Sequence, residues 1–122
     1  MEPSPPAERA HEPSAQESQL LKGVLDIAVL AVLERRDSYG YDVVRQLREA
    51  GLTQVGDASV YGTLRRLFKL GALKSYVVPS DEGPHRKYYG LNDVGRGQLD
   101  SGRKTWQAFV SAMSVVLEGE TS

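Results

Sequence analysis

The chain contains no cysteine, and this absence excludes several kinds of chemistry. Without thiols there can be no disulfide bond, no zinc site built on cysteine and no thiol nucleophile. Histidine is scarce too, because His11 and His85 are the only two and lie far apart in the sequence. Neither has an orienting acid at a recognisable spacing, so no catalytic triad is indicated. We therefore expect no metal site, no cofactor and no enzymatic activity.

Long apolar runs are absent as well. No stretch approaches the roughly 20 apolar residues that a membrane span needs, and the first residues lack the basic-then-apolar pattern of a secretion signal. The lack of cysteine fits a reducing compartment. These features predict a cytoplasmic protein with no membrane partner.

Neither sign of charge is in excess over the whole chain, which has 15 Lys and Arg, 16 Asp and Glu and a formal net charge of -1. The balance differs along the sequence, because residues 1–17 carry Glu2, Glu8, Glu12 and Glu17 against Arg9 alone. The remaining chain is mildly basic, which is compatible with nucleic-acid binding. Residues 1–17 also hold most of the prolines and almost no large apolar side chain, so we predict that they form a disordered tail.

Two helices are predicted directly after this tail. The first begins near Ser18, and within it residues 20–33 have apolar side chains on nearly every side, as is typical of a helix buried by more than one neighbour. The second is expected at residues 38–50, with Ser38 as its N-cap and Gly51 as the residue that ends it. Its inward-facing residues are predicted to be Tyr41, Val44 and Leu47.

A third helix is predicted at residues 57–70, with Asp57 as its N-cap. At 100° per residue, its apolar side comprises Val60, Leu64, Leu67 and Phe68. Its other side comprises Ser59, Gly62, Arg65, Arg66 and Lys69. The second and third helices, with the short glycine-containing connection between them, are candidates for a helix-turn-helix.

Two strands and a last helix complete the predicted elements. Residues 73–78 and 86–91 are rich in tyrosine and valine, and the polar turn formers between them predict a β-hairpin with a long loop. Tyr88 and Tyr89 are expected to pack against the protein rather than stack on bases. Asn92 can cap a helix at residues 93–118.

This order of elements predicts a mostly α fold with a small β-hairpin. We assign a winged helix-turn-helix DNA-binding domain to residues 18–91 and a C-terminal dimerisation helix to residues 92–122. An amphipathic terminal helix with no later element to pack on usually binds another subunit. The residues expected at the dimer interface are Leu21, Leu25, Leu99, Trp106, Phe109, Val110, Met113, Val116 and Leu117.

The outer side of the third helix carries groups that DNA recognition needs. Hydroxyl groups and cations suit base edges and phosphates in the major groove, which is wide enough to admit a helix. The hairpin offers further cations, although Asp81 and Glu82 in its loop oppose this role. The residues predicted to contact DNA are Ser59, Tyr61, Gly62, Thr63, Arg65, Arg66, Lys69, His85, Arg86, Lys87 and Lys22. Those expected to read bases are Ser59, Thr63, Arg65 and Arg66.

Several short motifs, taken in order, resemble the PadR family of bacterial transcriptional regulators. They are Tyr39-Gly40-Tyr41, Ser59-Val60-Tyr61-Gly62-Thr63-Leu64 with Arg66-Leu67, Gly71-Ala72-Leu73 and Arg86-Lys87-Tyr88-Tyr89-Gly90-Leu91-Asn92-Asp93-Val94-Gly95. The resemblance covers roughly residues 20–117 and differs from the family at Asn92, where threonine is more usual. The single C-terminal helix is similar to that of the short-armed subgroup, which includes multidrug-sensing PadR-like repressors.

The resemblance implies a homodimer that binds a palindromic operator in double-stranded DNA and represses nearby genes. It also implies release by a small aromatic or planar ligand bound between subunits. Trp106 would then stack on the ligand and Ile27 would line its pocket. From the residues alone, the default interpretation of Trp106 is a core aromatic of the dimer, and a wall of a ligand pocket between subunits is the alternative.

Two other functions fit parts of the sequence. A winged-helix protein-interaction module that does not bind DNA would explain the near-neutral net charge and the acidic hairpin loop. The other is a ligand sensor whose main partner is another regulator, and quenching of Trp106, the only tryptophan, by planar compounds would test for its ligand site. The salt dependence of DNA affinity separates the interaction module from a DNA-binding protein, because the affinity of a DNA-binding protein falls steeply with salt concentration.

Overall fold

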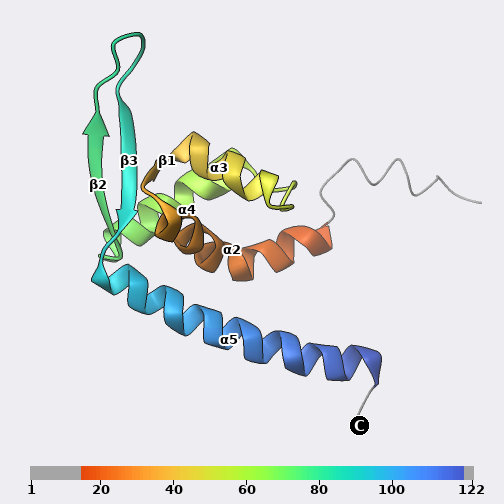
Figure 1. Cartoon of the computed structure of the whole chain (residues 1–122). Helices are drawn as coiled ribbons and strands as arrows, with labels where there is room; N and C mark the ends of the chain where they lie inside the picture. The colour runs from red at the N-terminus through yellow and green to blue at the C-terminus, as the bar shows by residue number, and fades with distance from the viewer. Residues whose placement is uncertain (1–14, 120–122) are drawn as a thin grey trace, which may run out of the picture.

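The computed structural model describes the backbone of residues 15–119 and the side chains of residues 24–119. In chain order its elements are α2 (Ala15–Arg35), β1 (Ser38–Tyr39), α3 (Gly40–Glu49), α4 (Asp57–Lys69), β2 (Leu73–Val78), β3 (Arg86–Leu91) and α5 (Asp93–Glu118). Figure 1 shows α2, α3 and α4 gathered beside a standing hairpin, with α5 running beneath them. This confirms the predicted mostly α fold of a winged helix-turn-helix followed by a long helix.

Helix α2 is the central element because apolar side chains cover nearly all its sides. Val29 is fully buried, and Leu30 and Leu33 are almost so. Helices α3, α4 and α5 and strand β3 all contact α2, which confirms the prediction of a helix covered by more than one neighbour. The helix begins earlier than expected, since residues 15–17, assigned to the disordered tail, are helical. Residues 1–14 lie outside the described part of the chain.

The predicted start of the second helix, with Ser38 as its N-cap, was wrong. Ser38 lies in strand β1, where its hydroxyl donates to the Arg36 carbonyl (3.2 Å) and accepts from Nε2 of Gln46 (3.2 Å). Helix α3 therefore begins at Gly40, after the extended Tyr39. Both strand residues pair with β3, and this long-range pairing overrides the preference of serine for helix N-caps.

The inner side of α3 also differs from the predicted stripe. Val44 and Leu47 are buried as expected, but Tyr41 is 55 % exposed and Val43 is buried in its place. Tyr41 lies in the first turn of α3, where it lines a surface hollow instead of entering the core. The core side of this helix is therefore formed by Val43, Val44 and Leu47, and Tyr41 is not part of it.

A buried carboxylate ties α3 to the end of α2. Asp42 accepts from Arg36 (3.2 Å), from Nε2 of Gln46 (3.0 Å) and from Arg45. Burial raises the pKa of this carboxyl, but hydrogen bonds from the two arginines outweigh burial, and the net pKa is lowered. The stabilisation that results is present above the ordinary pKa of aspartate and is lost as the pH falls through the lowered value.

Glycines end both helices of the helix-turn-helix in the same way. Gly51 after α3 and Gly71 after α4 have φ angles of 117° and 85°. The amide of each glycine donates to the carbonyl three residues earlier, and the next amide donates to the carbonyl five residues earlier, all at 3.0 Å. These are Schellman motifs, in which glycine avoids the cost that a side chain meets at positive φ. The predicted role of Gly51 is confirmed.

Arg48 holds the connection between α3 and α4. Its guanidinium donates to the Val55 carbonyl (2.8 and 3.1 Å) and to Asp57 (3.4 Å). Asp57 was expected to cap α4 but is its first residue, because Gly56 occupies the cap position without a side-chain hydrogen bond. This role of Arg48 was not predicted, because the side chain reaches across a loop.

Strands β2 and β3 have the predicted bounds and pair antiparallel, from Leu73 opposite Leu91 to Val78 opposite Arg86. The sheet order is β1-β3-β2, so β3 is central and β1 is a third strand that was not predicted. The tyrosines of β3 pack against the protein as expected, because Tyr89 is buried. The ring of Tyr88 contacts the ring of Tyr76, with 5.8 Å between the centroids, and the ring of Tyr39, with 5.4 Å.

Helix α5 begins with the predicted cap. The Asn92 side chain accepts from the Gly95 amide (2.9 Å) and donates to the Gly71 carbonyl (2.9 Å). The first half of the helix packs on α2. Their closest approach includes Gly102, where an added Cβ would lie 2.9 Å from Cγ1 of Ile27.

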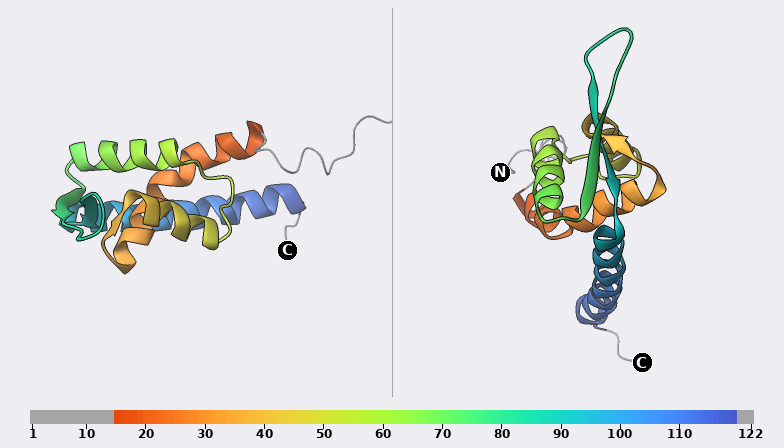
Figure 2. Two further views of the ribbon diagram at one scale, coloured as in Figure 1. Left: turned by 90° about the horizontal axis from the view of Figure 1, so that it is seen from above. Right: turned by 90° about the vertical axis from the view of Figure 1, so that its left-hand side faces the viewer.

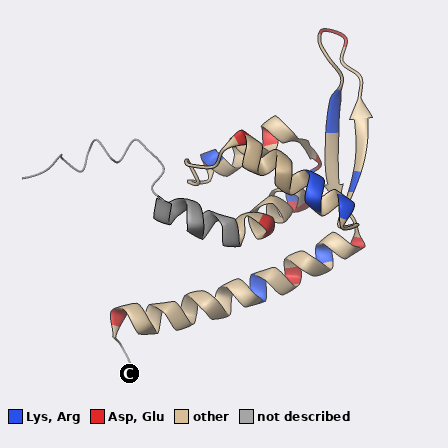
Figure 3. Ribbon diagram, turned by 180° about the vertical axis from the view of Figure 1, so that it is seen from behind, with Lys and Arg blue, Asp and Glu red and all other residues tan. Residues whose placement is uncertain are grey.

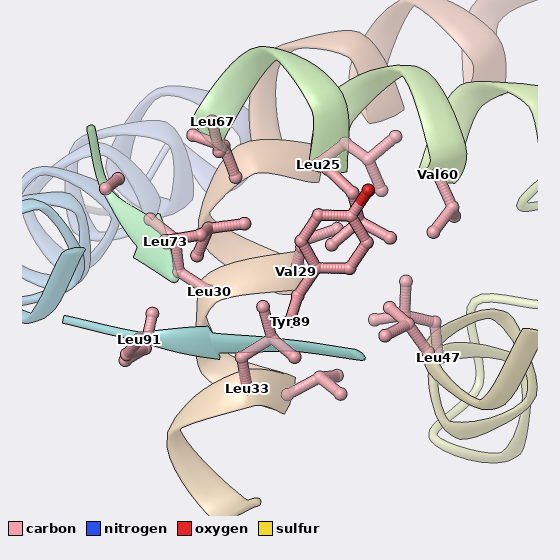
Figure 4. Close-up of a cluster of buried hydrophobic side chains, with 14 of the residues drawn as sticks. Leu25, Val29, Leu30, Leu33, Leu47, Val60, Leu67, Leu73, Tyr89 and Leu91 are labelled. Atoms are coloured by element: carbon pink, nitrogen blue, oxygen red, sulfur yellow. The ribbon is translucent and has the colours of Figure 1, made fainter. Parts of the chain in front are cut away.

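The hydrophobic core lies where α2, α3, α4 and the sheet meet, and α5 closes one side of it. Figure 4 shows these side chains converging on a single cluster. Its most deeply buried members are Val29, Val43, Val44, Val60, Leu64, Leu67 and Leu99. Burial of each such side chain contributes about 1.5–3 kcal/mol. The core therefore fixes one side of α4 on α2 and leaves the opposite side of α4 exposed.

The hairpin and α5 extend from opposite sides of the helical body. Figures 1 and 2 both show the β2–β3 hairpin rising on one side and α5 lying on the other. Within residues 24–119 no three acidic or histidine side chains lie together as metal ligands would. None of the helices in the described part of the chain is long and apolar enough to cross a membrane.

The packing at the start of α5 predicts opposite effects for two glycines. A Cβ at Gly95 would overlap the Ala72 backbone carbonyl and lie 3.0 Å from Cδ2 of Leu91, whereas nothing lies within 4 Å of a Cβ at Gly97. We expect Gly95→Ala to lower the free energy of unfolding by about 1–3 kcal/mol, as overpacking does. Gly97→Ala should leave it unchanged or raise it by up to about 1 kcal/mol, since alanine favours helix. Urea denaturation at matched protein concentrations measures both, and equal effects would contradict the packing described.

Candidate nucleic-acid interface

The exposed side of α4 carries most, but not all, of the residues predicted for it. Ser59, Arg65 and Lys69 are exposed, and Gly62 is half-buried with nothing within 4 Å of where its Cβ would be. Thr63 was wrong as a base-reading residue, because it is only 7 % exposed. Its position on the helix places it beside Val60 and Leu67 rather than opposite them. The open centre of this face is therefore the line of Gly62, Arg65 and Lys69.

Among the described residues, about half of the cations are paired with carboxylates, and most of the unpaired ones lie close together. Within residues 24–119, the basic side chains in ion pairs are Arg36, Arg45, Arg48, Arg66, Lys74, Arg96 and Arg103. Those in the same part of the chain without an ion pair are Arg35, Arg65, Lys69, Arg86, Lys87 and Lys104. Four of these six lie on α4 and β3. Figure 3 shows the basic stretches of these two elements on neighbouring ribbons.

A hollow of about 380 Å³ lies between α3, α4 and the sheet. Its lining residues are Tyr39, Gly40, Tyr41, Tyr61, Leu64, Arg65, Arg86, Lys87 and Tyr89. They include three cations and four phenols but no carboxylate. Hydroxyl donors beside cations suit phosphate oxygens, so the hollow extends the cationic face of α4 toward the hairpin.

Aromatic rings hold the cations of this hollow in place. The guanidinium carbon of Arg86 lies 4.5 Å from the centroid of the Tyr39 ring, and Nζ of Lys87 lies 5.6 Å from the Tyr89 ring. Such contacts orient a cation without cancelling its charge. Tyr61 in turn packs over Gly40, where no larger residue fits without displacing the ring.

The wing, residues 73–91, combines a basic strand with an acidic loop. His85, Arg86 and Lys87 are exposed, as are Asp81 and Glu82 in the loop. In Figure 3 the acidic tip stands beyond the basic part of β3. The cations nearest α4 are therefore those at the start of β3, and the tip repels phosphate.

The wing is anchored to the end of α2 by a hydrogen bond. Tyr76 on β2 donates its hydroxyl to Asp37 at 2.6 Å, and Lys74 pairs with the same carboxylate at 3.8 Å. The hydrogen bond to Asp37 raises the pKa of Tyr76. Gly90 is required beside this contact, because a Cβ there would overlap the Asp37 carboxylate. The position of β2 is thus set by a residue that precedes the sheet.

Arg66 differs from Arg65 in having a carboxylate partner. Its two terminal nitrogens donate to Asp26 on α2 at 2.5 and 3.1 Å. This hydrogen bonding raises the pKa of Arg66. The side chain is still 52 % exposed, but it is turned toward α2 rather than along the centre of the α4 face. Asp26 was missed from the sequence, since 40 positions separate the two residues.

The family of the chain follows from comparison with known proteins. The model of the "Transcriptional regulator PadR-like family" matches residues 29–101, which include α3, α4, the wing and the start of α5. This protein belongs to the PadR-like family. The region matched contains the exposed face of α4 and the cations of β3, so the family assignment covers the site as well as the fold.

Solved structures of PadR-like regulators have the same architecture. A PadR-like transcriptional regulator from Bacillus cereus is 33 % identical with a TM-score of 0.74, and the alignment covers 84 % of this chain and 99 % of that one. A family member from Eggerthella lenta has a TM-score of 0.77 at 28 % identity, covering 87 % and 92 %. PadR of Bacillus subtilis, solved in complex with operator DNA, has a TM-score of 0.59 at 26 % identity, covering 64 % of this chain and 45 % of that one.

The last half of α5 exposes the apolar stripe of this PadR-like protein. Trp106, Phe109, Val110, Val116 and Leu117 are between 38 % and 74 % exposed, and Met113 is half-buried. Leu25 and Leu99, also predicted at a dimer interface, were misplaced because both are buried in the core of their own chain. They occupy the inner side of α2 and the first turns of α5, where these helices pack together. The side chains of Leu21 and Lys22 lie outside the described residues.

Proposed function

We propose that this PadR-like regulator is a homodimeric repressor that binds a palindromic operator in double-stranded DNA. The observation that carries the proposal is the clustering of unpaired cations on α4 and β3. Phosphate contacts supply much of the affinity of DNA-binding proteins, and a cation held by a carboxylate is less available for them. The structural similarity to PadR of Bacillus subtilis, which was solved with operator DNA, supports the same assignment.

In this proposal α4 lies in the major groove as the recognition helix. The side chain missing at Gly62 lets the backbone approach the bases closely. Arg65 and Lys69 follow on the same side one and two turns later, where they reach base edges or phosphates. Ser59 and Arg66 lie on the flank toward α2 and contact the edge of the same site.

The wing and the hollow beside it bind the DNA backbone. Arg86, Lys87 and His85 contact phosphates, and the Tyr61 hydroxyl donates to another. Lys22, whose side chain is not among those described, is proposed to contact phosphate as well. The acidic tip formed by residues 81–82 repels phosphate, so the wing contacts only the DNA strand that lies next to β3.

Dimerisation through the exposed stripe of α5 would pair two such faces. Two recognition helices then enter successive major grooves about 34 Å apart, which is why the operator is proposed to be palindromic. We also propose that a flat aromatic ligand binds between subunits beside Trp106 and Ile27. Such a ligand would lower DNA affinity by favouring a different spacing of the two helices.

We expect Arg65→Ala to weaken binding to the selected operator by about 1–3 kcal/mol and to make the salt dependence less steep if the lost contact is to phosphate. The operator is first obtained by selecting bound sequences from random duplex DNA, and affinity is then measured by fluorescence anisotropy over a salt series. Lys104→Ala is the matched control, because it removes another unpaired cation from the opposite end of the fold.

Equal losses in the two variants would mean that only net charge matters and would contradict a site on α4. Affinity that does not change with salt would instead favour the winged-helix protein-interaction module, for which the exposed acids at residues 81–82 are the supporting observation.

The proposed dimer predicts a clear difference between two aspartate substitutions on α5. Val110, one turn after Trp106, lies on the apolar stripe, whereas Ala108 lies on the opposite side of the helix. Val110→Asp should dissociate the dimer, because it buries an unpaired carboxylate, and Ala108→Asp should leave it intact. Analytical ultracentrifugation distinguishes the two. A wild-type monomer, or two variants that behave alike, would contradict this interface.

Ligand binding beside Trp106 can be followed without labels, since Trp106 is the only tryptophan. We expect a planar aromatic dye to quench its fluorescence with saturation in the absence of DNA, because the ring would stack on the ligand. A non-aromatic ring compound of similar size is the control and should quench less. Linear quenching by both compounds would indicate collisions only and would exclude the proposed ligand site.

A further inference from the structure

Two bidentate ion pairs connect α2 to two other helices. Asp26 binds Arg66 of α4 at 2.5 and 3.1 Å, and Glu34 binds Arg103 of α5 at 2.7 and 3.4 Å. All four side chains are between 42 % and 52 % exposed. Solvent screens half-exposed ion pairs, although bidentate geometry raises their contribution to stability. The first pair also engages a residue of α4, the helix proposed to lie in the major groove.

The Asp26 pair lies at the edge of the exposed face of α4. Helical periodicity places Arg65 and Lys69 near the centre of that face and Arg66 on the flank toward α2. Arginine has five N–H donors in a fixed plane, and a bidentate contact with a carboxylate occupies two of them. While Asp26 is bound, Arg66 is therefore partly neutralised and aimed away from the line of Gly62 and Arg65.

The acid that holds Arg66 is adjacent to the contact between α2 and α5. Ile27, the next residue, packs against Gly102 so closely that an added Cβ would lie 2.9 Å from its Cγ1. Asp26 therefore lies one residue from the contact between α2 and α5, on the same helix.

We propose that Asp26 is a positioning residue that competes with DNA for Arg66, so that α2 sets how strongly the recognition helix binds. This inference rests on the proposed DNA-binding function and adds a regulatory element to it. Binding requires the guanidinium to exchange the carboxylate for a phosphate or a base edge. The ion pair thus lowers affinity for every DNA sequence and restricts tight binding to sites that compensate for its loss.

Asp26→Asn tests the proposal on the full-length protein. With the carboxylate removed, Arg66 is free to bind phosphate, and we expect affinity for random-sequence duplex DNA to rise several-fold at low salt. The plot of log affinity against log salt should steepen by about 1, the value for one additional phosphate contact. Glu34→Gln is the matched control, because it removes the same charge from the same helix and frees Arg103 on α5, away from α4.

A double variant separates competition from simple repulsion between Asp26 and DNA. In the Arg66→Ala background, Asp26→Asn should change neither the affinity nor the salt dependence, because no arginine remains to be released. Asp26→Glu should restore near-wild-type binding. Thermal melting checks that each variant is folded, and Asp26→Ala provides a second removal of the carboxylate.

The outcomes separate this inference from the proposed function. If the wild type binds DNA and Asp26→Asn binds no more tightly, or if the gain persists without Arg66, the competition proposed for Asp26 is excluded while DNA binding stands. A gain of equal size in Glu34→Gln would likewise overturn it. If the wild type has no salt-dependent affinity for duplex DNA, the proposed function itself fails, and this inference fails with it.

Discussion

Burial of α2 on nearly all of its sides is the constraint from which the other positions follow. A helix without a polar side cannot face water, so α3, α4, α5 and β3 must each cover part of it. Covering α2 uses one side of α4 and leaves the opposite side exposed. It also uses the first half of α5 and leaves the second half uncovered. The exposed side of α4 and the apolar stripe of α5 therefore have the same origin, because both are surfaces that the covering of α2 leaves unused.

In the folded protein, ion pairs between side chains decide where unpaired charge is exposed, and the overall composition does not. The net charge of -1 gives no indication of a DNA-binding surface. Within residues 24–119, acids on α2, on α3 and around the turns pair with most of the arginines, and four of the six unpaired cations lie on α4 and β3. A nearly neutral chain can in this way present a cationic face, because what DNA meets is the local excess. The aromatic contacts of Arg86 and Lys87 orient these charges without reducing that excess.

Elements with strong local signals could be predicted, and those that depend on distant partners could not. The bounds of β2, β3 and α5 follow from runs of β-branched and aromatic residues and from the Asn92 cap, which act over a few positions. Strand β1 has two residues and exists because β3 is beside it, so serine at position 38 suggested a helix cap instead. Thr63 was misassigned because its small polar side chain gave no sign of burial. Arg48 acts across a loop and Asp26 pairs with a helix 40 positions away, and sequence spacing indicates neither contact.

The packed tyrosines of the sheet have a mechanical consequence. Tyr39, Tyr88 and Tyr76 bridge the three strands near the helical body, and the bond from Tyr76 to Asp37 fastens that end. No comparable ring contact lies beyond the pairing of Val78 with Arg86 in the described hairpin. The stiffness of the hairpin should therefore decrease from its base beside the helical body to its tip. In the proposed complex with DNA, the tip of such a hairpin would adapt to grooves of different width while its base keeps a constant angle to α4.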